Sequence, residues 1–437
     1  MPDDKAESQV RRLVGRHRID FETRIFVERR SLRQRKMRMR LNRSSQLVLA
    51  SAVSLTAAGL LTACSSTLTV DFVYVTSARA AGPNSYGEID VYEINSESGR
   101  MRTIPASPFP SGGRNPVAEA VSPDSTTLYV VNQDDNSIVQ FTIGNDGKVY
   151  PQNTTNTPGV FPLAVSLAGK YLFVADTYQP LPTCSTAAPC SGSVAVFPVG
   201  ASDALGPAVV NSSVNAGYWP LSLPAHPSDV LTPTAITTAG SGAYLYVTAF
   251  DATAGGGYVF AFAVNGDGTL SALNGGVPFA AGQHPSSIAS APGGGFIYVT
   301  DSASNSLYSY ANNSGILAPV GGSPFATGNA PSAVVADATG NHVFVANALD
   351  SNLTVYSSSS GVVTALGNYP TGTQPVAIGI DPSLNEYIYT ANFLGNTVTG
   401  FQMNAGTGAL LNSQYSPYAA NANPTAVAAI THGKPKT

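Results

Sequence analysis

Among the residues of this sequence that could do chemistry, Glu119 stands out because it interrupts an apolar pattern. It is the fourth residue of a short segment that opens with Pro116, and the same position in six related segments is apolar: Val165, Ile236, Ile288, Val334, Ile378 and Val427. A carboxyl group there must be paired, hydrated or protonated, because an unpaired buried charge is very costly. Glu119 is therefore a candidate catalytic acid or base. The structural alternative is a carboxyl group bonded to the main chain or to Arg114.

His284 is the second candidate catalytic residue, because an imidazole exchanges its proton near neutral pH. It directly precedes Pro285 at the start of another related segment. A lone histidine is, however, more often a surface or hydrogen-bonded residue. Polar residues at or beside the same position of other segments could form a ligand-binding cup with it: Arg114, Asn115, Gln283, Gln374 and Asn423.

Trp219 is a further candidate ligand-binding residue. It is the one tryptophan of the chain and follows Tyr218 within an insertion. An exposed indole ring could stack on a sugar or anchor a protein partner. The alternative is that the ring only caps the insertion.

Several catalytic and metal-binding signatures are absent from the sequence. There is no Gly-x-Ser-x-Gly nucleophile motif, no His-Glu-x-x-His zinc motif and no phosphate-binding loop. The Asp-Gly turns lack the downstream glutamate and the ligand spacing of an EF-hand. Cys184 and Cys190 lack the spacing and the nearby histidines of a zinc site. We therefore expect neither a metal ion nor a cofactor.

The candidate residues belong to a repeat that predicts how they are positioned. The stretch from Pro331 to Tyr356, PSAVVADATGNHVFVANALDSNLTVY, has counterparts that begin at Pro116, Pro285 and Pro375. Each unit reads as short strands separated by turns, and self-similarity at a period of about 40–50 residues indicates a solenoid or a β-propeller. Because the unit contains strands only, we expect an all-β propeller.

Seven longer strands alternate with seven proline-led strands, but the two sets are out of phase. The chain begins with a longer strand at residues 72–75 and ends with a proline-led strand at residues 424–430. In a propeller both chain ends must complete the last blade, or two sheet edges stay open. Residues 71–431 are thus predicted to form a monomeric seven-bladed β-propeller closed by its C-terminal strand. The proline-led strands begin at Pro116, Pro162, Pro233, Pro285, Pro331, Pro375 and Pro424.

The loops of the repeat also carry a pattern. The longer strands often end in Asn or Asp, and a second Asn often follows in the loop. Such side chains bond their own backbone, so we expect them to hold these turns. Two connections exceed the repeat length, at residues 176–192 and 211–231, and both are expected on the face where the proline-led strands begin. Insertions on one face of a repeat protein usually mark its binding face.

The first 64 residues differ in charge from the remainder. They contain 14 Lys/Arg and 6 Asp/Glu, leaving 8 and 20 for residues 65–437, so the net charge is +8 before the break and −12 after it. The acidic remainder argues against a nucleic-acid partner, which needs a basic surface. Residues 1–36 have no apolar period, and we interpret them as a mis-called start or a disordered basic leader.

Residues 37–63 have the order of a secretory signal peptide: a basic start, an apolar run too short to span a membrane, and small residues before Cys64. The sequence Leu61-Thr-Ala-Cys64 resembles a bacterial lipobox, which implies that Cys64 is lipidated and anchors the chain through a linker at residues 64–70. The alternative is a buried cysteine at the end of a core helix. Ser65 resembles the residue found in lipoproteins of the outer membrane. We expect an exported protein, lipid-anchored on the periplasmic or the surface side of that membrane.

Two further features complete the organisation of the chain. Cys184 and Cys190 are the cysteines that remain after Cys64, and an even pair in an oxidising compartment most simply forms a disulfide. Residues 432–437 follow the last predicted strand and form a tail.

The strand sequences resemble those of a known family. LYVVN at residues 128–132 and IYVTD at 297–301, with their proline-led partners, are similar to the YVTN repeats of the lactonase-type, 6-phosphogluconolactonase-like seven-bladed propellers. The resemblance covers nearly all of residues 70–430. It implies a lactone or muconate ring held over the central channel by histidine, arginine and glutamate. Closer relatives of the phosphogluconolactonase branch open a blade with Pro-His-x-His, whereas this chain has Pro116-Val-Ala-Glu119. It also has no arginine after Arg114, so most of the ring cannot offer a guanidinium group to a phosphate or a carboxylate. Both departures argue against the enzymatic interpretation.

These observations predict a cell-envelope lipoprotein whose propeller binds a ligand or a protein partner, such as a carbohydrate or another protein, on one face of the ring. The alternative is a hydrolase of an unphosphorylated sugar lactone that works through Glu119 and His284. A structural surface scaffold is the third interpretation. Close approach of Glu119, His284 and Arg114 at one channel mouth would favour the enzyme. Wide separation together with a flat aromatic patch around Trp219 would favour binding.

Overall fold

The computed structural model describes residues 70–78, 85–95, 98–180, 184, 189–382 and 386–431. Residues 68–437 form one compact unit. The predicted leader at 1–36, the signal peptide at 37–63, the lipidation site Cys64 with its linker up to residue 69, and the tail at 432–437 lie outside the described residues. Within the described part of the chain, no helix has the length and apolarity needed to cross a membrane.

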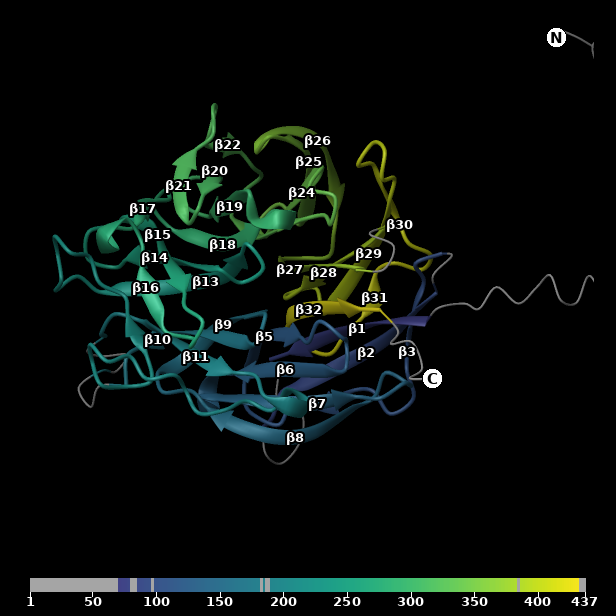
Figure 1. The fold of residues 1–437 in the computed structure, drawn as a ribbon. Coiled ribbons are helices and arrows are strands. Elements are labelled where there is room, and N and C mark those ends of the chain that lie inside the picture. The colour runs from purple at the N-terminus through teal and green to yellow at the C-terminus, as the bar shows by residue number, and fades with distance from the viewer. Residues whose placement is uncertain are drawn as a thin grey trace, which may run out of the picture. The chain divides into compact units, whose positions relative to one another are not determined.

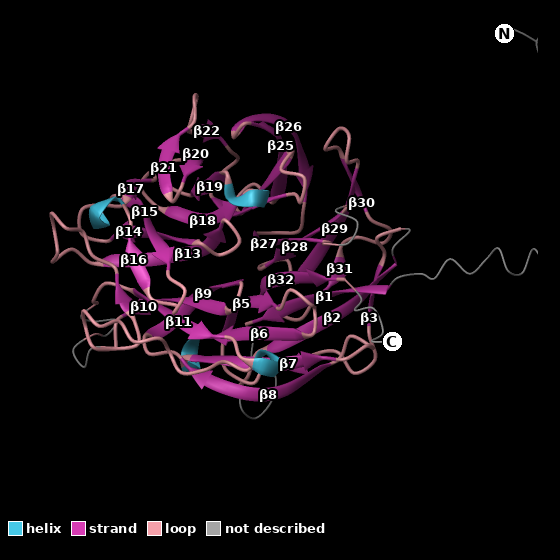
Figure 2. Ribbon diagram, in the orientation of Figure 1, coloured by secondary structure: helices cyan, strands magenta, loops and turns pink. Residues whose placement is uncertain are grey.

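The described residues form seven antiparallel sheets of four or five strands, which follow one another around a ring (Figures 1 and 2). The innermost strands of neighbouring sheets contact each other in sequence until the ring is closed. This arrangement confirms the predicted all-β, seven-bladed propeller. Short 3₁₀ helices lie in the connections: η1 (Gln133–Asp135), η2 (Ala201–Asp203), η3 (Asn274–Gly276) and η4 (Pro292–Gly294).

The first four blades are built as follows. Blade 1 contains β32 (Pro424–Ile430), β1 (Val70–Ser77), β2 (Glu88–Asn95), β3 (Met101–Thr103) and β4 (Phe109–Pro110). Blade 2 contains β5 (Pro116–Val121), β6 (Thr127–Asn132), β7 (Ser137–Ile143) and β8 (Val149–Asn156). Blade 3 contains β9 (Val160–Ala168), β10 (Tyr171–Tyr178), β11 (Ser193–Pro198) and β12 (Trp219–Pro220). Blade 4 contains β13 (Leu231–Ala239), β14 (Tyr244–Asp251), β15 (Gly257–Val264), β16 (Leu270–Ala272) and β17 (Phe279–Ala280).

The remaining three blades follow the same order from the inner to the outer strand. Blade 5 contains β18 (Pro285–Ser290), β19 (Phe296–Asp301), β20 (Ser306–Asn313), β21 (Ile316–Pro319) and β22 (Phe325–Ala326). Blade 6 contains β23 (Pro331–Ala336), β24 (His342–Asn347), β25 (Asn352–Ser359) and β26 (Val362–Pro370). Blade 7 contains β27 (Pro375–Ile380), β28 (Tyr387–Asn392), β29 (Thr397–Met403), β30 (Leu410–Asn412) and β31 (Tyr418–Ala419).

The ring is closed by β32, as the sequence predicts. This strand is the innermost strand of blade 1 and pairs antiparallel with β1, so that Phe72 lies opposite Ile430 and Val75 lies opposite Val427. Strands from the two ends of the propeller sequence thus share one sheet. This pairing leaves no blade with an open inner edge at the chain ends.

The core lies between the blades. Seven hydrophobic clusters occur among the described residues, and each takes its side chains from two neighbouring blades. Successive side chains of a strand point to opposite faces of its sheet, so each blade packs against both neighbours. The fourth residue of an inner strand points into such an interface: Ile288 packs between blades 4 and 5, and Val334 packs between blades 5 and 6.

Hydroxyl groups also join neighbouring blades. The hydroxyl of Tyr74 in blade 1 donates to the carbonyl oxygen of Gly147 in blade 2 at 2.9 Å, and Tyr129 of blade 2 donates to that of Asp203 at 2.5 Å. Nearer the channel, three inner strands donate from their second residue to the carbonyl oxygen of the proline that opens the next inner strand: Ser286 to Pro331, Ser332 to Pro375 and Thr425 to Pro116.

The prolines that open the inner strands lie at one end of the ring, which we call the proline face; the other end is the opposite face. The loops between the second and third strands of the blades lie at the proline face, because the second strand runs antiparallel to the inner strand and ends there. The loop after β10, which contains the Cys184–Cys190 disulfide, and the return from β12 to β13 both reach this face. The disulfide between Cys184 and Cys190, predicted from the sequence, is present.

The Asn and Asp turns differ partly from expectation. The carboxylate oxygen Oδ1 of Asp301 accepts the N–H groups of Ala303 and Ser304 in its own turn, as predicted. The second Asn of the loop instead bonds the following inner strand: the side-chain oxygen of Asn136 accepts the N–H of Phe161 at 2.7 Å. Asn305 and Asn396 do the same for Ala330 and Asn423. These side chains join neighbouring blades because the next inner strand begins directly beside the loop.

Candidate functional site

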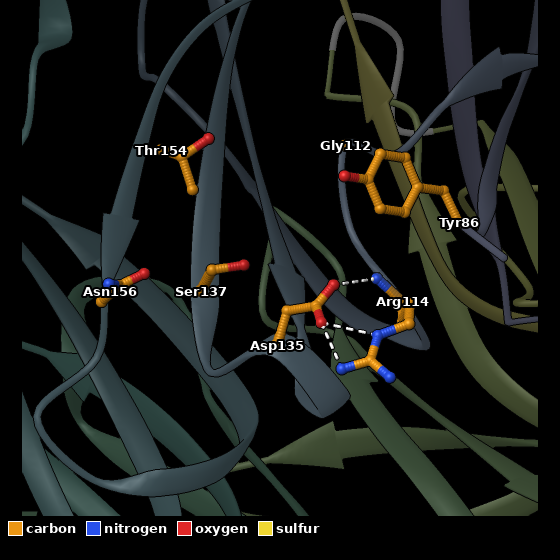
Figure 3. A pocket seen from close by; sticks show the side chains of 7 residues that line it. All are labelled: Tyr86, Gly112, Arg114, Asp135, Ser137, Thr154 and Asn156. Carbon is orange, nitrogen blue, oxygen red and sulfur yellow. Dashed lines mark hydrogen bonds and ion pairs between the residues drawn. The ribbon is translucent and has the colours of Figure 1, made fainter. Parts of the chain in front are cut away.

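A cleft with a volume of about 470 Å³ opens on the proline face between blades 1 and 2. Its lining residues come from the connections of blade 1, from the segment that leads into β5, and from η1, β7 and β8 of blade 2. Hydroxyl, amide and charged side chains predominate, which suits a small polar ligand. Figure 3 shows the lining residues: Tyr86, Gly112, Arg114, Asp135, Ser137, Thr154 and Asn156.

An ion pair between Arg114 and Asp135 lies at the centre of the cleft (Figure 3). Nε and Nη2 of Arg114 each lie 2.6 Å from Oδ1 of Asp135, and the Arg114 N–H donates to Oδ2 at 2.7 Å. Nη2 also donates to the carbonyl oxygen of Asp134 at 3.0 Å. The Arg114 side chain is nevertheless 50% exposed, and its Nη1 makes no hydrogen bond to a described residue. One side of the guanidinium group is thus left for a ligand.

The ionisation of Asp135 follows from this pairing. Partial burial acts to raise the pKa of the Asp135 carboxyl, but the hydrogen bonds and the positive charge of Arg114 outweigh it and hold the pKa below its usual range. The cleft therefore contains a carboxylate and a guanidinium side by side at neutral pH. Such a pair can orient a water molecule or sugar hydroxyls with one group and polarise a carbonyl oxygen with the other.

The Asp135 carboxylate also has a structural role that recurs in the ring. In blade 6, Asp350 occupies the same repeat position and accepts the N–H of Asn329 at 2.7 Å, just as Asp135 accepts the N–H of Arg114. The Asn329 side chain bonds back to Asp350 at 2.7 Å. What distinguishes the cleft is therefore the guanidinium group of Arg114, which supports the turn and also extends beyond it.

The charges of the proline face favour an uncharged or cationic ligand. Arg114 is the one Lys or Arg on this face among the described residues, and it is paired with Asp135. The four other described cations lie at or next to turns of the opposite face: Arg100, Arg102, Lys148 and Lys170. Further carboxylates on the proline face are Glu88, Asp134, Asp229 and Asp350.

Glu119 lies deeper, on the inner strand β5. It is the only titratable side chain of the seven inner strands, and it points from β5, opposite Val130, towards β32. Both carboxyl oxygens are buried without a hydrogen-bond partner among the described residues. Burial raises the pKa of Glu119 well above its usual range, and the nearby N–H of Ala428, which makes no well-formed hydrogen bond to the carboxyl group, offsets only part of this effect. Arg114 does not pair with it, so the carboxyl group favours its protonated form.

His284 lies on another part of the ring. It is exposed at the start of blade 5, its ring centroid lies 4.2 Å from that of Phe250, and its Nδ1 lies 3.2 Å from the hydroxyl oxygen of Ser302. Glu119 and Arg114 belong to the blade 2 segment, three blades away around the ring. The structure therefore does not bring Glu119, His284 and Arg114 to one point of the channel mouth.

The remaining predicted binding residues differ in availability. The amide of Asn115 donates to Gln133 and Asp134, each at 3.1 Å, and the amide of Asn423 donates to the carbonyl oxygen of Phe393 at 3.2 Å. Gln374 is half-buried and Gln283 is exposed, both at the starts of inner strands.

Trp219 does not form the aromatic patch considered above. Its side chain is buried in the cluster between blades 3 and 4, and Nε1 donates to the carbonyl oxygen of Leu270 at 3.1 Å. The neighbouring Tyr218 is buried as well. Trp219 is therefore a core residue, which corresponds to the structural alternative, and its ring offers no exposed face for stacking.

Sequence reasoning missed most of the cleft. Asp135 could have been found by aligning the repeats, because it matches Asp350 while Arg114 matches Asn329. No sequence signal marks Tyr86, or the side chains of Ser137, Thr154 and Asn156, as neighbours. Among the described residues, no group of three His, Cys, Asp or Glu side chains could hold a metal ion.

Comparison with known proteins shows the same fold that the structure shows, a seven-bladed propeller. The family described as Lactonase, 7-bladed beta-propeller, matches residues 72–428. The periplasmic gluconolactonase of Pseudomonas aeruginosa is 21% identical, with a TM-score of 0.66 over 83% of this chain and 99% of that one. A candidate 6-phosphogluconolactonase of Bacteroides uniformis is 18% identical, with a TM-score of 0.65 over 82% and 99% of the two chains. A protein of Lactobacillus plantarum is 16% identical, with a TM-score of 0.64 over 82% and 98%. At these identities the structures show a shared fold. No curated protein matches the sequence.

Proposed function

The chain belongs to the lactonase family of seven-bladed β-propellers, and on this premise we propose that it hydrolyses an unphosphorylated sugar lactone in the cleft between blades 1 and 2. The observation that carries the proposal is the Arg114–Asp135 pair within a cleft lined by hydroxyl and amide groups. A sugar lactone offers hydroxyl groups to such a lining and a carbonyl group to the guanidinium.

The reaction would use the two charged groups differently. Arg114 Nη1 donates to the lactone carbonyl oxygen and stabilises the negative charge that develops there. The Asp135 carboxylate orients the attacking water molecule. Water adds to the carbonyl carbon and gives up a proton, the bond from that carbon to the ring oxygen breaks, and the ring oxygen takes up a proton, so that no net proton is gained or lost in forming the neutral acid. The product is the open-chain hydroxy acid.

The absence of a phosphate on the substrate follows from the charges. A phosphorylated lactone brings about two negative charges at neutral pH. In the cleft it would meet Arg114, already paired with Asp135, and the neighbouring carboxylate of Asp134. Like charges in a partly enclosed site disfavour binding.

We also propose that the protein is exported and lipid-anchored at Cys64. The basic, apolar and small-residue segments before this cysteine support the proposal, because they have the order of a lipoprotein signal peptide. The Cys184–Cys190 disulfide supports export, because disulfides persist in oxidising compartments.

Binding without turnover is the second candidate function. The observation in its favour is the lowered pKa of Asp135, because a carboxylate of low pKa is a weak general base. Glu119 and His284, the stronger acid–base candidates, do not line the cleft.

Titrimetric hydrolysis of gluconolactone and related aldonolactones by residues 65–437 tests the proposal. Arg114→Gln should lower kcat/KM about 100-fold, the typical effect of removing one oxyanion donor, and Asp135→Asn should lower it as well. The control is Lys148→Gln, which breaks the Lys148–Asp146 ion pair of the opposite face and should leave the rate unchanged. Glu119→Gln and His284→Ala should also retain activity.

Each outcome separates the alternatives. Full activity in Arg114→Gln, or a loss in Glu119→Gln and His284→Ala instead, would refute the assignment of the site. If the wild-type chain binds lactone by calorimetry without turnover, and Arg114→Gln abolishes this binding, the second candidate function holds. If the wild-type chain neither hydrolyses nor binds these lactones, they are excluded as its ligands.

A further inference from the structure

The direction in which the chain enters the propeller carries an inference about its orientation. β1 begins at Val70, opposite Asn95, and ends at Ser77, opposite Pro424 of the proline face. The chain therefore enters the ring at the opposite face. Only residues 65–69 separate Cys64 from Val70. A chain of this length reaches roughly 20 Å when fully extended.

We propose that the opposite face of the propeller lies against the lipid surface and that the proline face, with its cleft, points away from it. The proposal rests on the proposed lipid anchor at Cys64. Even when fully extended, a tether of roughly 20 Å spans no more than the height of a blade, so a relaxed tether holds the opposite face next to the membrane. The partner is thus the headgroup and upper acyl region of the bilayer that holds the anchor.

The side chains of the opposite face suit such a surface. The turns between the third and outer strands carry exposed apolar residues at the start of the outer strand in four blades: Tyr150 (48% exposed), Ile316 (38%), Val362 (42%) and Leu411 (73%). Ile316, Val362 and Leu411 belong to the consecutive blades 5, 6 and 7, and blade 7 adjoins the blade in which β1 begins. Apolar tips of this kind insert at the boundary between headgroups and acyl chains.

Cationic and aromatic groups lie on the same face. Lys148 follows the turn that precedes Tyr150, and the Arg100 guanidinium lies 4.6 Å from the ring centroid of the exposed Tyr415. Tyrosine rings and long cationic side chains are enriched where proteins meet the membrane–water interface, because they combine an apolar body with a polar end. The described proline face has Arg114 as its one cation, paired with Asp135, whereas the described opposite face has four cations, of which Arg102 and Lys148 are paired with Glu93 and Asp146.

The orientation keeps the cleft accessible. The inner strands contain six to nine residues, so the ring is roughly 20–30 Å high. The cleft would lie at that height above the lipid, open to dissolved ligands. The two most exposed leucines of the described residues lie at opposite ends of the ring: Leu411 on the opposite face and Leu349, which is 76% exposed, on the proline face. Labels at these two positions would therefore show which end lies nearer the lipid.

The test uses the full chain, produced in a bacterium that processes lipoproteins and reconstituted in phosphatidylethanolamine–phosphatidylglycerol vesicles with nitroxide-labelled headgroups. Leu411→Cys and Leu349→Cys each add one free thiol for a fluorophore, because Cys184 and Cys190 form a disulfide and Cys64 would carry the lipid. The mass of the purified chain shows whether Cys64 is lipidated. We expect the label at 411 to be quenched several-fold more strongly than the label at 349.

The failures of the anchor and of the orientation are distinguishable. A mature chain without the added lipid mass would refute the anchor and, with it, the orientation. A lipidated chain in which the label at 349 is quenched more strongly, or in which both labels are quenched equally or not at all, would refute the orientation alone. Cys64→Ser serves as the unanchored control, with no quenching expected at either label.

Discussion

The buried carboxyl group of Asp176 should make the stability of the propeller depend on pH. Asp176 lies near the end of β10, the second strand of blade 3, and is fully buried. Gly159 packs so closely that a Cβ there would lie 2.3 Å from the Cβ of Asp176. Burial raises the pKa of Asp176 to about 7, although the Thr157 side chain and the N–H of Gly159 act to lower it. Asparagine occupies the same repeat position in three other blades, at Asn132, Asn347 and Asn392.

The sign and size of the effect follow from this pKa. The unfolded carboxyl group titrates near 3.8 and the folded one near 7, so the folded state holds more protons between these values. The free energy of unfolding therefore falls as the pH rises through this window and levels off above it. A difference of about three units corresponds to about 4 kcal/mol, with a slope of at most about 1.4 kcal/mol per pH unit. Asp176→Asn should remove this loss, because the amide carries no charge.

Urea unfolding of residues 65–437 between pH 4 and pH 9 measures the effect. The difference in unfolding free energy between Asp176→Asn and wild type should grow by about 4 kcal/mol in favour of the variant from pH 4 to pH 8. Asp301→Asn is the matched control: the same substitution at the same repeat position removes a carboxylate that accepts N–H bonds from Gln283, His284, Ala303 and Ser304, and it should destabilise the propeller. A difference between Asp176→Asn and wild type that does not change with pH would refute the reasoning.

Two further predictions concern residues that sequence reasoning assigned to function. Glu119→Val, which restores the residue of the equivalent strands, should raise the free energy of unfolding at neutral and alkaline pH, because burial raises the pKa of Glu119 and disfavours its charged form; equal stability of variant and wild type at pH 9 in urea unfolding would contradict this. Trp219→Ala should cost about 3–5 kcal/mol of stability, because it empties a core position and leaves the carbonyl oxygen of Leu270 without its donor; a variant as stable as wild type would contradict the core assignment.

The fold was predictable because its signals are local and repeated. Seven blades are specified by strands with alternating apolar residues and by prolines at the strand starts. Their closure is specified because the chain begins with a longer strand and ends with an unpartnered proline-led strand. The observed pairings of Val75 with Val427 and of Glu119 with Val130 keep this alternation. The role of Asn136 was missed, because its partner Phe161 lies in the following blade and is adjacent only after the ring has formed.

The site was less predictable because it depends on contacts that the repeat does not encode. Glu119 was identified correctly as an exception to an apolar pattern, but its oxygens are enclosed against β32. His284 lies at the start of an inner strand as expected, yet blades 2 and 5 are separated by half the ring. Arg114 pairs with Asp135 of the adjacent loop and not with Glu119, because Glu119 points into the interface with β32.

The residues that precede the inner-strand prolines show why the expected polar cup is only partly available. Five of the seven adopt left-handed backbone conformations, although a residue before proline normally avoids them. These five residues have φ values from 50° to 60°, and their side chains have little in common: Asn115, Phe161, Ala330, Gln374 and Asn423. The shared feature is the carbonyl group, which accepts the N–H of the adjacent loop at Asn115, Ala330, Gln374 and Asn423. The main chain, not the side chain, is therefore what this position requires.

The amides at this position are largely committed to the same turns. The Asn115 amide bonds the loop that holds Asp134, and the Asn423 amide bonds the carbonyl oxygen of Phe393. A ligand could engage them only by displacing bonds that stabilise the mouth of the ring. Arg114 lies one residue earlier and can hold the turn and bind a ligand at the same time. Its N–H, Nε and Nη2 bond the turn, while Nη1 is left without a partner among the described residues. Recognition at this face should therefore depend on Arg114 more than on the amides around the channel.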